Sequence, residues 1–334
     1  MEKGLRDTMR QPRVNIVIVN YNSYSYTAAC LSSLFKSTYD NYRILIVDNH
    51  SSDNSIEELS AWLDEQNLNY GICKPEEHEV TKQIEKPEVR VILIRNNRNS
   101  GFGAGNNRAL KPLIKSSSED YIWLLNPDTE VEPEVMNDLV LATGNGEKII
   151  TGNSIYEFIN RDKIIYCGGF KVHKNYHGMT DIVDPKAIGH IDAIAGASLF
   201  TPATTFIDLG LFPEHYFMYW EETDFCTLAK KKGYTFKINH RSKIYDHVGA
   251  TAKGNFLREY LYLLNGLRYH KKYNYWRIPF ILLSTSIKLL KAMLIEDKIK
   301  RKALYYAHVD FFKLIWNGNI NIKNRLNQNR IDAN

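Results

Sequence analysis

The sequence has few cysteines, no long uncharged apolar run and no internal repeat, and each absence excludes a class of protein. Four cysteines in 334 residues, with no C-x-x-C pair, argue against a disulfide framework or a structural zinc site and fit a reducing compartment, so we expect a cytoplasmic protein. No uncharged apolar run reaches about 18 residues, because Lys288 and Lys291 interrupt the best one, and we expect no membrane-spanning helix. The N-terminal segment also lacks the apolar region of a signal peptide.

Charge is distributed unevenly along the chain, although the net charge is only +5. From Lys271 to the end there are 13 Lys/Arg against 4 Asp/Glu, whereas the preceding 270 residues hold 30 basic and 34 acidic groups. A basic tail on a slightly acidic body indicates a polyanionic partner, and the aromatic residues of the tail favour a membrane over nucleic acid. The alternative is that the tail helices pack on the rest of the protein or form a dimer, with a solvated basic face.

The first 150 residues alternate between apolar strand patterns and helical patterns. Short apolar runs separated by helices predict a parallel sheet covered on both faces. We expect strands at 14–20, 42–49, 89–96 and 121–128. The charged stretch 71–88 between the second helix and the third of these strands is interpreted as a surface insertion. From 255 onward the pattern is helical and rich in aromatic residues.

Polar residues end each of these four strands. Ligands of open α/β sheets bind at the carboxyl ends of strands, so four polar ends on one edge outline one pocket, although a single Asp there is more often a turn residue. The strand ends are Asn20-Tyr21-Asn22, Asp48-Asn49, Asn96 and Asn126-Pro127-Asp128. The turn 99–107 follows the third strand, and its glycines would let backbone N–H groups approach a phosphate. It does not match G-x-G-x-x-G, so it is not a dinucleotide fingerprint.

A cluster of acids, Glu221-Glu222-Thr223-Asp224, lies among aromatic residues. Mutual repulsion and apolar surroundings raise carboxylate pKa values, which makes the cluster a candidate general base. The competing interpretation is a solvated helix start, where the helix dipole favours acids. His247, after the last strand pattern, is a candidate partner of Asp128 in binding Mn²⁺ or Mg²⁺, with phosphate oxygens completing the shell.

Taken in order, these motifs over about residues 13–270 resemble the inverting, GT-A-type family 2 glycosyltransferases, in particular their rhamnosyltransferase-like branch. The resemblance rests on the order and spacing of VIVNYN, VDNHSSD, NNRNSGFGAGNN, LLNPD, DAIAGASLF and FMYWEETDFCTLAKKKGY. It implies an α/β, GT-A nucleotide-diphospho-sugar transferase fold with a Rossmann-like, mostly parallel sheet and a C-terminal helical extension. The implied domains are 1–255 (a nucleotide-binding half at about 13–130 and an acceptor half at about 131–255) and 256–334.

The resemblance also implies roles for individual residues. The nucleotide-sugar site would be formed by Asn20, Tyr21, Asn22, Asp48, Asn99, Asn106 and Asn126. Asp128 and His247 would hold a divalent metal, with Asn126 in the place of the first acid of the D-x-D motif. Glu222 would be the catalytic base, where relatives carry aspartate, with Glu221 and Asp224 as lesser candidates. The segment 192–202 fits either an acceptor-side loop or a buried strand.

The implied function is transfer of a sugar from a nucleotide-sugar to a hydroxyl of a lipid-linked or polysaccharide acceptor in cell-surface glycan synthesis. The best match of the glycine-rich loop is to enzymes that use dTDP-rhamnose, and a UDP-hexose transferase of the same fold is the alternative. A silent sugar-binding module, a nicotinamide oxidoreductase and a nucleic-acid-binding protein are the more distant alternatives. We expect peripheral contact with anionic membrane through the C-terminal helices.

Overall fold

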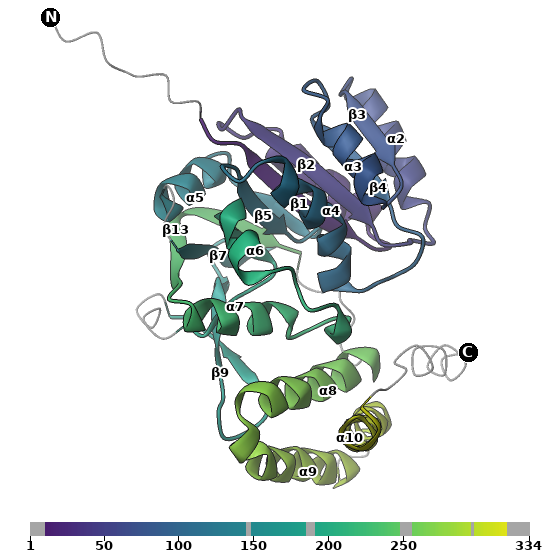
Figure 1. Cartoon of the computed structure of the whole chain (residues 1–334), viewed down its shortest axis with the longest axis vertical. Coiled ribbons are helices and arrows are strands. Elements are labelled where there is room, and N and C mark those ends of the chain that lie inside the picture. The colour runs from purple at the N-terminus through teal and green to yellow at the C-terminus, as the bar shows by residue number, and fades with distance from the viewer. Residues whose placement is uncertain (1–10, 145–147, 185–190, 248–255, 295–296, 319–334) are drawn as a thin grey trace, which may run out of the picture.

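The computed structural model describes residues 11–144, 148–184, 191–247, 256–294 and 297–318. Figure 1 shows an α/β part, with helices on both faces of a twisted sheet, and a group of three C-terminal helices at the opposite end of the molecule. The main sheet has ten strands in the order β3-β4-β2-β1-β5-β12-β7-β13-β6, with β8 paired to β7.

The N-terminal half of this sheet is entirely parallel. Its strands are β1 (Val14–Asn20), β2 (Tyr42–Asp48), β3 (Tyr70–Cys73), β4 (Val91–Arg95) and β5 (Tyr121–Leu125). Its helices are α1 (Tyr24–Leu34), α2 (Ser55–Glu65), α3 (Glu77–Ile84) and α4 (Phe102–Ser116). Alternate residues of β1 enter different cores: Ile16 and Ile18 belong to one apolar cluster and Val17 to the other. Burial on both faces explains the continuous apolar strands that predicted this sheet.

The interpretation of 71–88 as a surface insertion was wrong. The segment contains most of edge strand β3 and all of helix α3, and Cys73, Val80 and Ile84 are buried in a core cluster. The signal was weak because β3 is a four-residue strand with only alternate residues buried. Helix α3 contributes only Val80 and Ile84, four residues apart, to its buried face.

The second half of the sheet is mixed. Strand β12 (Ser198–Pro202) is antiparallel to β5 and to β7 (Ile149–Glu157), β13 (Thr235–Asp246) is parallel to β7, and β6 (Thr129–Val131) is antiparallel to β13. Strand β8 (Ile164–Cys167) pairs with β7, and a small sheet contains β9 (Gly169–Val172), β10 (Met179–Asp181) and β11 (Ala193–Ile194). The helices of this half are α5 (Val135–Thr143), α6 (Ala203–Leu209), the short η2 (Glu214–Tyr216) and α7 (Glu221–Lys231).

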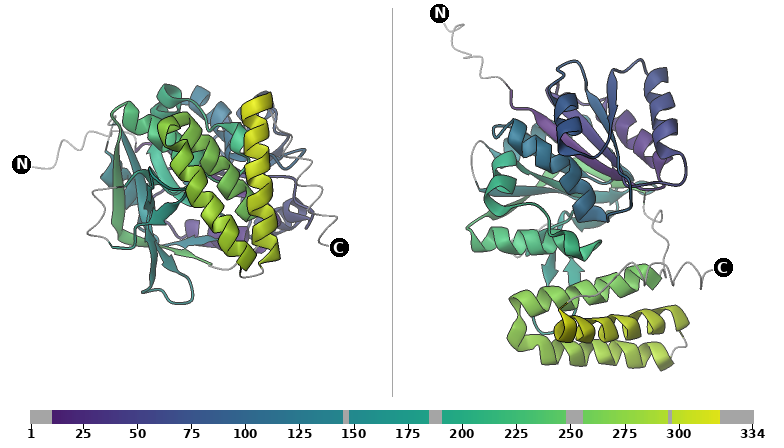
Figure 2. Two further views of the ribbon diagram at one scale, coloured as in Figure 1. Left: turned by 90° about the horizontal axis from the view of Figure 1, so that it is seen from below. Right: turned by 45° about the vertical axis from the view of Figure 1, so that its right-hand side comes forward.

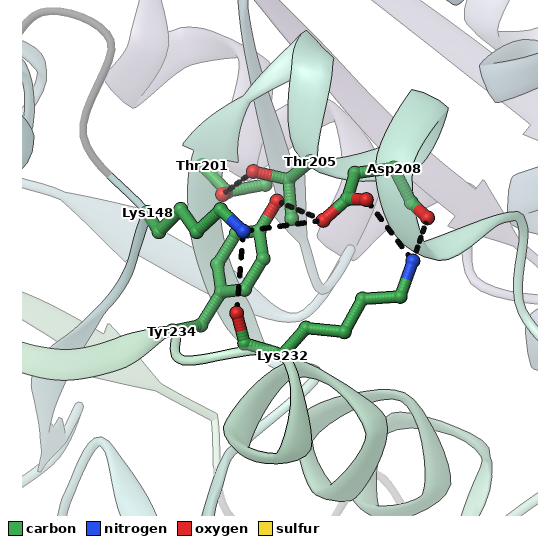
Figure 3. A network of polar contacts seen from close by, with 6 residues as sticks. All are labelled: Lys148, Thr201, Thr205, Asp208, Lys232 and Tyr234. Atoms are coloured by element: carbon green, nitrogen blue, oxygen red, sulfur yellow. Dashed lines mark hydrogen bonds and ion pairs between the residues drawn. The ribbon is translucent and has the colours of Figure 1, made fainter.

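A polar network fastens α6 to the turn that follows α7, and Figure 3 shows its members. Asp208 accepts a hydrogen bond from Lys232 Nζ at 3.0 Å and from the Tyr234 hydroxyl at 3.1 Å. Lys148 Nζ donates to the Lys232 carbonyl at 3.2 Å. These charged groups are exposed to solvent, so the network fixes the C-terminal end of α7 more than it stabilises the fold.

The C-terminal helices are α8 (Phe256–Tyr273), α9 (Ile278–Leu294) and α10 (Lys298–Asn317), with the short η3 (Tyr275–Arg277) before α9. They share an apolar core that includes Leu264, Ile281 and Phe311. The right-hand view of Figure 2 shows them as a layer of their own, with α8 nearest the α/β part. Within the described ranges, no helix has the combined length and hydropathy needed to cross a bilayer.

Candidate active site

The loops after β1 and β2 are fastened to each other at the carboxyl edge of the sheet. Asn20, which is fully buried, donates through Nδ2 to Asp48 Oδ1 at 3.0 Å and to Ser51 Oγ at 3.2 Å. The second Asp48 oxygen accepts from the Ser51 backbone N–H at 3.2 Å. Asn22 Oδ1 accepts from the Ser52 N–H at 2.7 Å. Tyr21, between the two asparagines, leaves 39% of its surface exposed.

Asn49 connects this edge to the glycine-rich start of α4. Its Nδ2 donates to Asn99 Oδ1 and to the Gly101 carbonyl, both at 3.1 Å, and its Oδ1 accepts from Asn96 Nδ2 at 3.0 Å. Asn99 Oδ1 also accepts the Gly101 N–H at 3.0 Å. Asn106 is buried and donates to the carbonyl of Phe102 within its own helix, so its contact is internal to α4.

Asp128 lies beyond β5 and faces the end of β13. One of its oxygens, Oδ1, is buried and has no hydrogen-bond partner. Burial raises the pKa of Asp128, and burial together with the Asp128 charge raises the pKa of Asp246 to about 7. Asn126 lies two residues before Asp128, and its backbone N–H donates to the Ala197 carbonyl at 3.0 Å. The negative charges of these two carboxylates repel each other, and one carboxylate has an oxygen without a hydrogen-bond partner. Such a pair fits a site for a divalent cation.

His247 follows Asp246, and its side chain already contacts two other residues. Its Nε2 lies 3.0 Å from Glu130 Oε1, and its ring stacks on Phe158 with centroids 3.8 Å apart. Its backbone N–H donates to the Asp128 carbonyl at 3.0 Å. The histidine therefore stands beside Asp128. No set of three His, Cys, Asp or Glu side chains in the described ranges converges as a metal site.

Glu221 and Glu222 open helix α7 in an apolar setting. Glu221 is 2% exposed, its Oε2 has no partner, and a Cβ on Gly103 would lie 3.4 Å from its Cγ. Burial and the neighbouring Glu222 raise the pKa of Glu221 well above its ordinary range. Glu222 is half-buried, lies near Gly196, and has its pKa raised by burial to about 7. A carboxylate that takes up a proton near neutral pH is matched to general-base chemistry.

Asp224 points away from this pair into a polar cluster with α8. Its oxygens accept from Lys272 Nζ at 2.7 and 2.9 Å, from the Tyr273 hydroxyl at 2.6 Å and from the Tyr216 hydroxyl at 2.8 Å. With every lone-pair direction used, Asp224 holds α7 against α8.

The turn at residues 195–197 lies between the two acidic regions. Its Ala197 carbonyl accepts the backbone N–H of Asn126, two residues before Asp128, at 3.0 Å. A Cβ on the neighbouring Gly196 would lie 3.9 Å from Glu222 Cγ. Burial raises the pKa of the Tyr166 hydroxyl on β8, and the carboxylates of Asp246, Asp181, Asp128 and Glu222 raise it further.

The segment 192–202 forms two short buried strands joined by a turn, and its place on the acceptor side stays a prediction. Ala193–Ile194 and Ser198–Pro202 are buried strands, and residues 195–197 between them form the turn beside Glu222. A Cβ on Gly196 would lie 3.0 Å from the Phe102 ring and 3.9 Å from Glu222 Cγ. A small residue at 196 therefore keeps the space next to Glu222 open.

The sheet order and the helices packed on it give an α/β structure of the GT-A fold. The chain belongs to the family described as Glycosyl transferase family 2, whose model matches residues 15–200.

Two curated relatives share part of its sequence. The UDP-Glc:alpha-D-GlcNAc-diphosphoundecaprenol beta-1,3-glucosyltransferase WfgD of Escherichia coli is 28% identical over 159 residues, which are 46% of this chain and 53% of that protein. The low-salt glycan biosynthesis hexosyltransferase Agl10 of Haloferax volcanii is 22% identical over 230 residues, 66% of this chain and 62% of that protein. The matches thus span little more than half of each relative.

Two solved structures share the fold. GalNAc-T7 with UDP, GalNAc and Mn²⁺ superposes with a TM-score of 0.58 at 18% identity, over 79% of this chain and 48% of that one. The mannosyltransferase PcManGT of Pyrobaculum calidifontis, with GDP-Man and Mn²⁺, superposes with a TM-score of 0.54 at 12% identity, over 94% of this chain and 90% of that one. Both structures contain Mn²⁺.

Asp246 and Tyr166 were not predicted from the sequence, and Asn49 and Asn96 were predicted only in part. Asn49 and Asn96 were noted only as strand ends, and their hydrogen bonds to the 99–101 turn could not be derived from spacing. Tyr166 carried no signal, because a tyrosine in a short β-strand is ordinary composition.

Proposed function

We propose that this protein transfers a sugar, with inversion at the anomeric carbon, from a pyrimidine nucleotide-sugar to a hydroxyl of a lipid-linked or polysaccharide acceptor in cell-surface glycan synthesis. The observation that carries the proposal is Glu222: a half-buried carboxylate with a pKa near 7, beside the small turn at Gly196. The 195–197 turn supports it, since the turn contacts the Asn126 backbone and also lies beside Glu222.

The reaction would proceed as a single displacement. Glu222 accepts the proton of the acceptor hydroxyl while that oxygen attacks the anomeric carbon from the face opposite the diphosphate. The bond between the anomeric carbon and the diphosphate oxygen breaks, and the leaving group departs with the electron pair, so the configuration inverts. Asp48 binds the base of the nucleotide, and the fully buried Asn20 orients the Asp48 carboxylate through its hydrogen bond. Proton acceptance by Glu222 contributes roughly 10²–10⁴-fold.

Asp128 and Asp246 fit a divalent cation because their carboxylates share a site and Asp128 Oδ1 has no other partner. Mn²⁺ or Mg²⁺ there would neutralise charge on the diphosphate, whose oxygens would complete its coordination. Because the His247 side chain is hydrogen-bonded to Glu130, we propose that its main role is to orient the Asp128 backbone and that metal binding is its secondary role.

The donor sugar is open between two candidates. The glycine-rich loop resembles enzymes that use dTDP-rhamnose, whereas the printed name of one relative specifies UDP-Glc. A thermal-shift panel of dTDP, UDP, GDP and their sugars, each with and without Mn²⁺, decides between them. A ligand at 100 times its Kd adds about 2.7 kcal/mol to the free energy of unfolding. A metal-dependent shift with dTDP or UDP supports the proposal, and no shift with any nucleotide contradicts it.

A membrane surface for the acceptor is proposed on α9. Six apolar residues recur every three or four positions and are 45–87% exposed. We call them the α9 stripe: Trp276, Phe280, Leu283, Ile287, Leu290 and Leu294. Exposed cations flank it at Arg277, Lys291 and Lys298. An apolar helical face bordered by basic residues fits the interface of an anionic bilayer.

Vesicle sedimentation tests the α9 stripe. The wild type should bind vesicles with phosphatidylglycerol more strongly than neutral ones, and the Leu283→Glu/Leu290→Glu double variant should lose at least about tenfold, because each buried leucine is worth about 1.5–3 kcal/mol. Leu141→Glu is the matched control, since Leu141 is 65% exposed on α5. Wild-type protein that ignores anionic lipid but dimerises through the stripe would show that a second copy covers this face.

A further inference from the structure

The five residues before Glu221, which we call the 216–220 segment, have an unusual backbone. Phe217, Tyr219 and Trp220 have φ angles of 65°, 70° and 79°. This left-handed region is sparsely populated by residues other than glycine, and most sparsely by bulky ones. Such a conformation persists only where the surrounding structure imposes it. The segment therefore depends on contacts from outside itself.

Asn265, on α8, supplies those contacts. Its side chain is fully buried, and Nδ2 donates to the carbonyls of Tyr216 at 2.6 Å, Met218 at 2.8 Å and Tyr219 at 3.3 Å. One amide nitrogen carries two hydrogens, so three carbonyls share them. These carbonyls converge on one point only while the segment keeps its left-handed turn.

The amide of Asn265 is held in the orientation that this role requires. Arg268 donates from one guanidinium nitrogen to Asn265 Oδ1 at 3.1 Å and to the His215 carbonyl at 2.9 Å. With its oxygen taken by a donor, the side chain can present only its nitrogen to the carbonyls. Trp220 adds a second link to α8, because its indole N–H donates to the Tyr262 carbonyl at 2.9 Å.

The 216–220 segment contacts both sides of the donor site. The Phe217 carbonyl accepts the N–H of Phe102, in the first turn of α4, at 2.7 Å. The same carbonyl oxygen lies only 1.9 Å from the position that a Cβ on residue Gly101 would take. Two residues after the segment comes Glu222. A shift of this backbone would therefore move the glycine-rich helix start and the base together.

We infer that Asn265 is a positioning residue: its amide holds the 216–220 segment in the one conformation that places Glu222 and the start of α4 for reaction. The inference rests on the proposed role of Glu222. It makes α8 a part of the catalytic apparatus, although α8 lies outside the region that the family model matches.

Asn265→Ala removes the three hydrogen bonds, and Asn239→Ala is the matched control. Asn239 is also a buried asparagine with two hydrogen bonds, but on β13. We expect kcat of Asn265→Ala to fall by about 10²-fold, the effect of misplacing a reacting group by about 1 Å, and the Kd for the nucleoside diphosphate to rise as well, because the start of α4 moves with the segment. Asn239→Ala should lower Tm without lowering kcat of the folded protein.

Hydrogen exchange gives a readout that does not require turnover. The amide of Phe102 is protected by the Phe217 carbonyl, so Asn265→Ala should raise its exchange rate by about tenfold or more, whereas Asn239→Ala should not. Unchanged Phe102 exchange, or an unchanged kcat, in Asn265→Ala overturns the inference. If the wild type transfers no sugar from any donor, the proposed function fails, and the exchange measurement still decides whether Asn265 holds the segment.

Arg268→Gln serves if Asn265→Ala does not fold. Arg268 is only partly buried, and its replacement frees the Asn265 amide to rotate. Exchange at Phe102 should then rise while the rest of α4 keeps the wild-type rate. Wild-type exchange at Phe102 in that variant also overturns the inference.

Discussion

Glu222→Gln should abolish transfer and, at the same time, stabilise the folded protein at high pH. Glutamine cannot accept the proton of the acceptor hydroxyl, so kcat should fall by roughly 10²–10⁴-fold. Because glutamine keeps the size of the side chain, the Kd for the nucleoside diphosphate should stay near the wild-type value. A residue with a structural role alone would lose stability when replaced.

The pKa of Glu222 sets the size and pH range of the stability effect. Burial raises this pKa from 4.5 to about 7. Below pH 4.5 the carboxyl is protonated in both states. Between 4.5 and 7 the unfolded chain releases the proton and the folded protein retains it, so wild-type stability falls across this range and the loss is complete above pH 7. A pKa difference of about 2.5 corresponds to about 3 kcal/mol, and solvent at the half-buried side chain reduces this to about 2 kcal/mol.

Thermal unfolding at pH 4 and pH 8 measures this effect. At about 2.1 cal/mol/K of unfolding entropy per residue, 2 kcal/mol raises Tm by about 3 °C. We expect this increase at pH 8 and none at pH 4. The same titration should appear as a fall in wild-type kcat below about pH 7. Transfer activity in Glu222→Gln above 10% of wild type would refute the role of Glu222, and a lower Tm at pH 8 would refute the burial argument.

Two further variants test other parts of the site. Asp128→Asn should weaken Mn²⁺-dependent nucleotide binding by about 10–100-fold, because it removes one charge from a pair of carboxylates that fits a cation. Nucleotide binding without metal should stay unchanged. Titration calorimetry with and without Mn²⁺ measures both affinities. Equal loss in both conditions would place Asp128 outside the metal site. Gly101→Ala should lower the free energy of unfolding by more than about 1 kcal/mol and lower nucleotide affinity. The reason is that Gly101 has φ +82° and its new Cβ would meet the Phe217 carbonyl. A wild-type Tm in this variant would contradict the prediction.

The parallel half of the sheet could be predicted from sequence because each strand is buried on both faces and is therefore apolar throughout. The carboxyl edge followed directly, since Asn20 and Asp48 end neighbouring strands and are hydrogen-bonded in the structure. The segment 71–88 was misread for the opposite reason: an edge strand and a short helix bury few side chains, and little apolar signal remains.

The contacts that complete the site could not be predicted, because they join residues far apart in the chain. Asp246 meets Asp128 through the pairing of β13 with β6. Asn265 meets the 216–220 segment through the packing of α8, and in the sequence it is one of several polar residues of that helix. Register and helix packing decide such contacts, and a single sequence records neither.

The position of β13 bears on the order in which the protein can be completed during synthesis. Among the residues that the structure describes, strand β6 pairs only with β13, and the contact between Tyr245 and Glu132 spans 113 residues. Parallel pairs β1–β2 and β2–β4 can form as soon as residue 95 has emerged from the ribosome, whereas β6 must wait for residue 246. Closing so long a loop is slow. The carboxyl ends of β1 and β2 can therefore be paired in a nascent chain long before the acids at the end of β13 are assembled beside them.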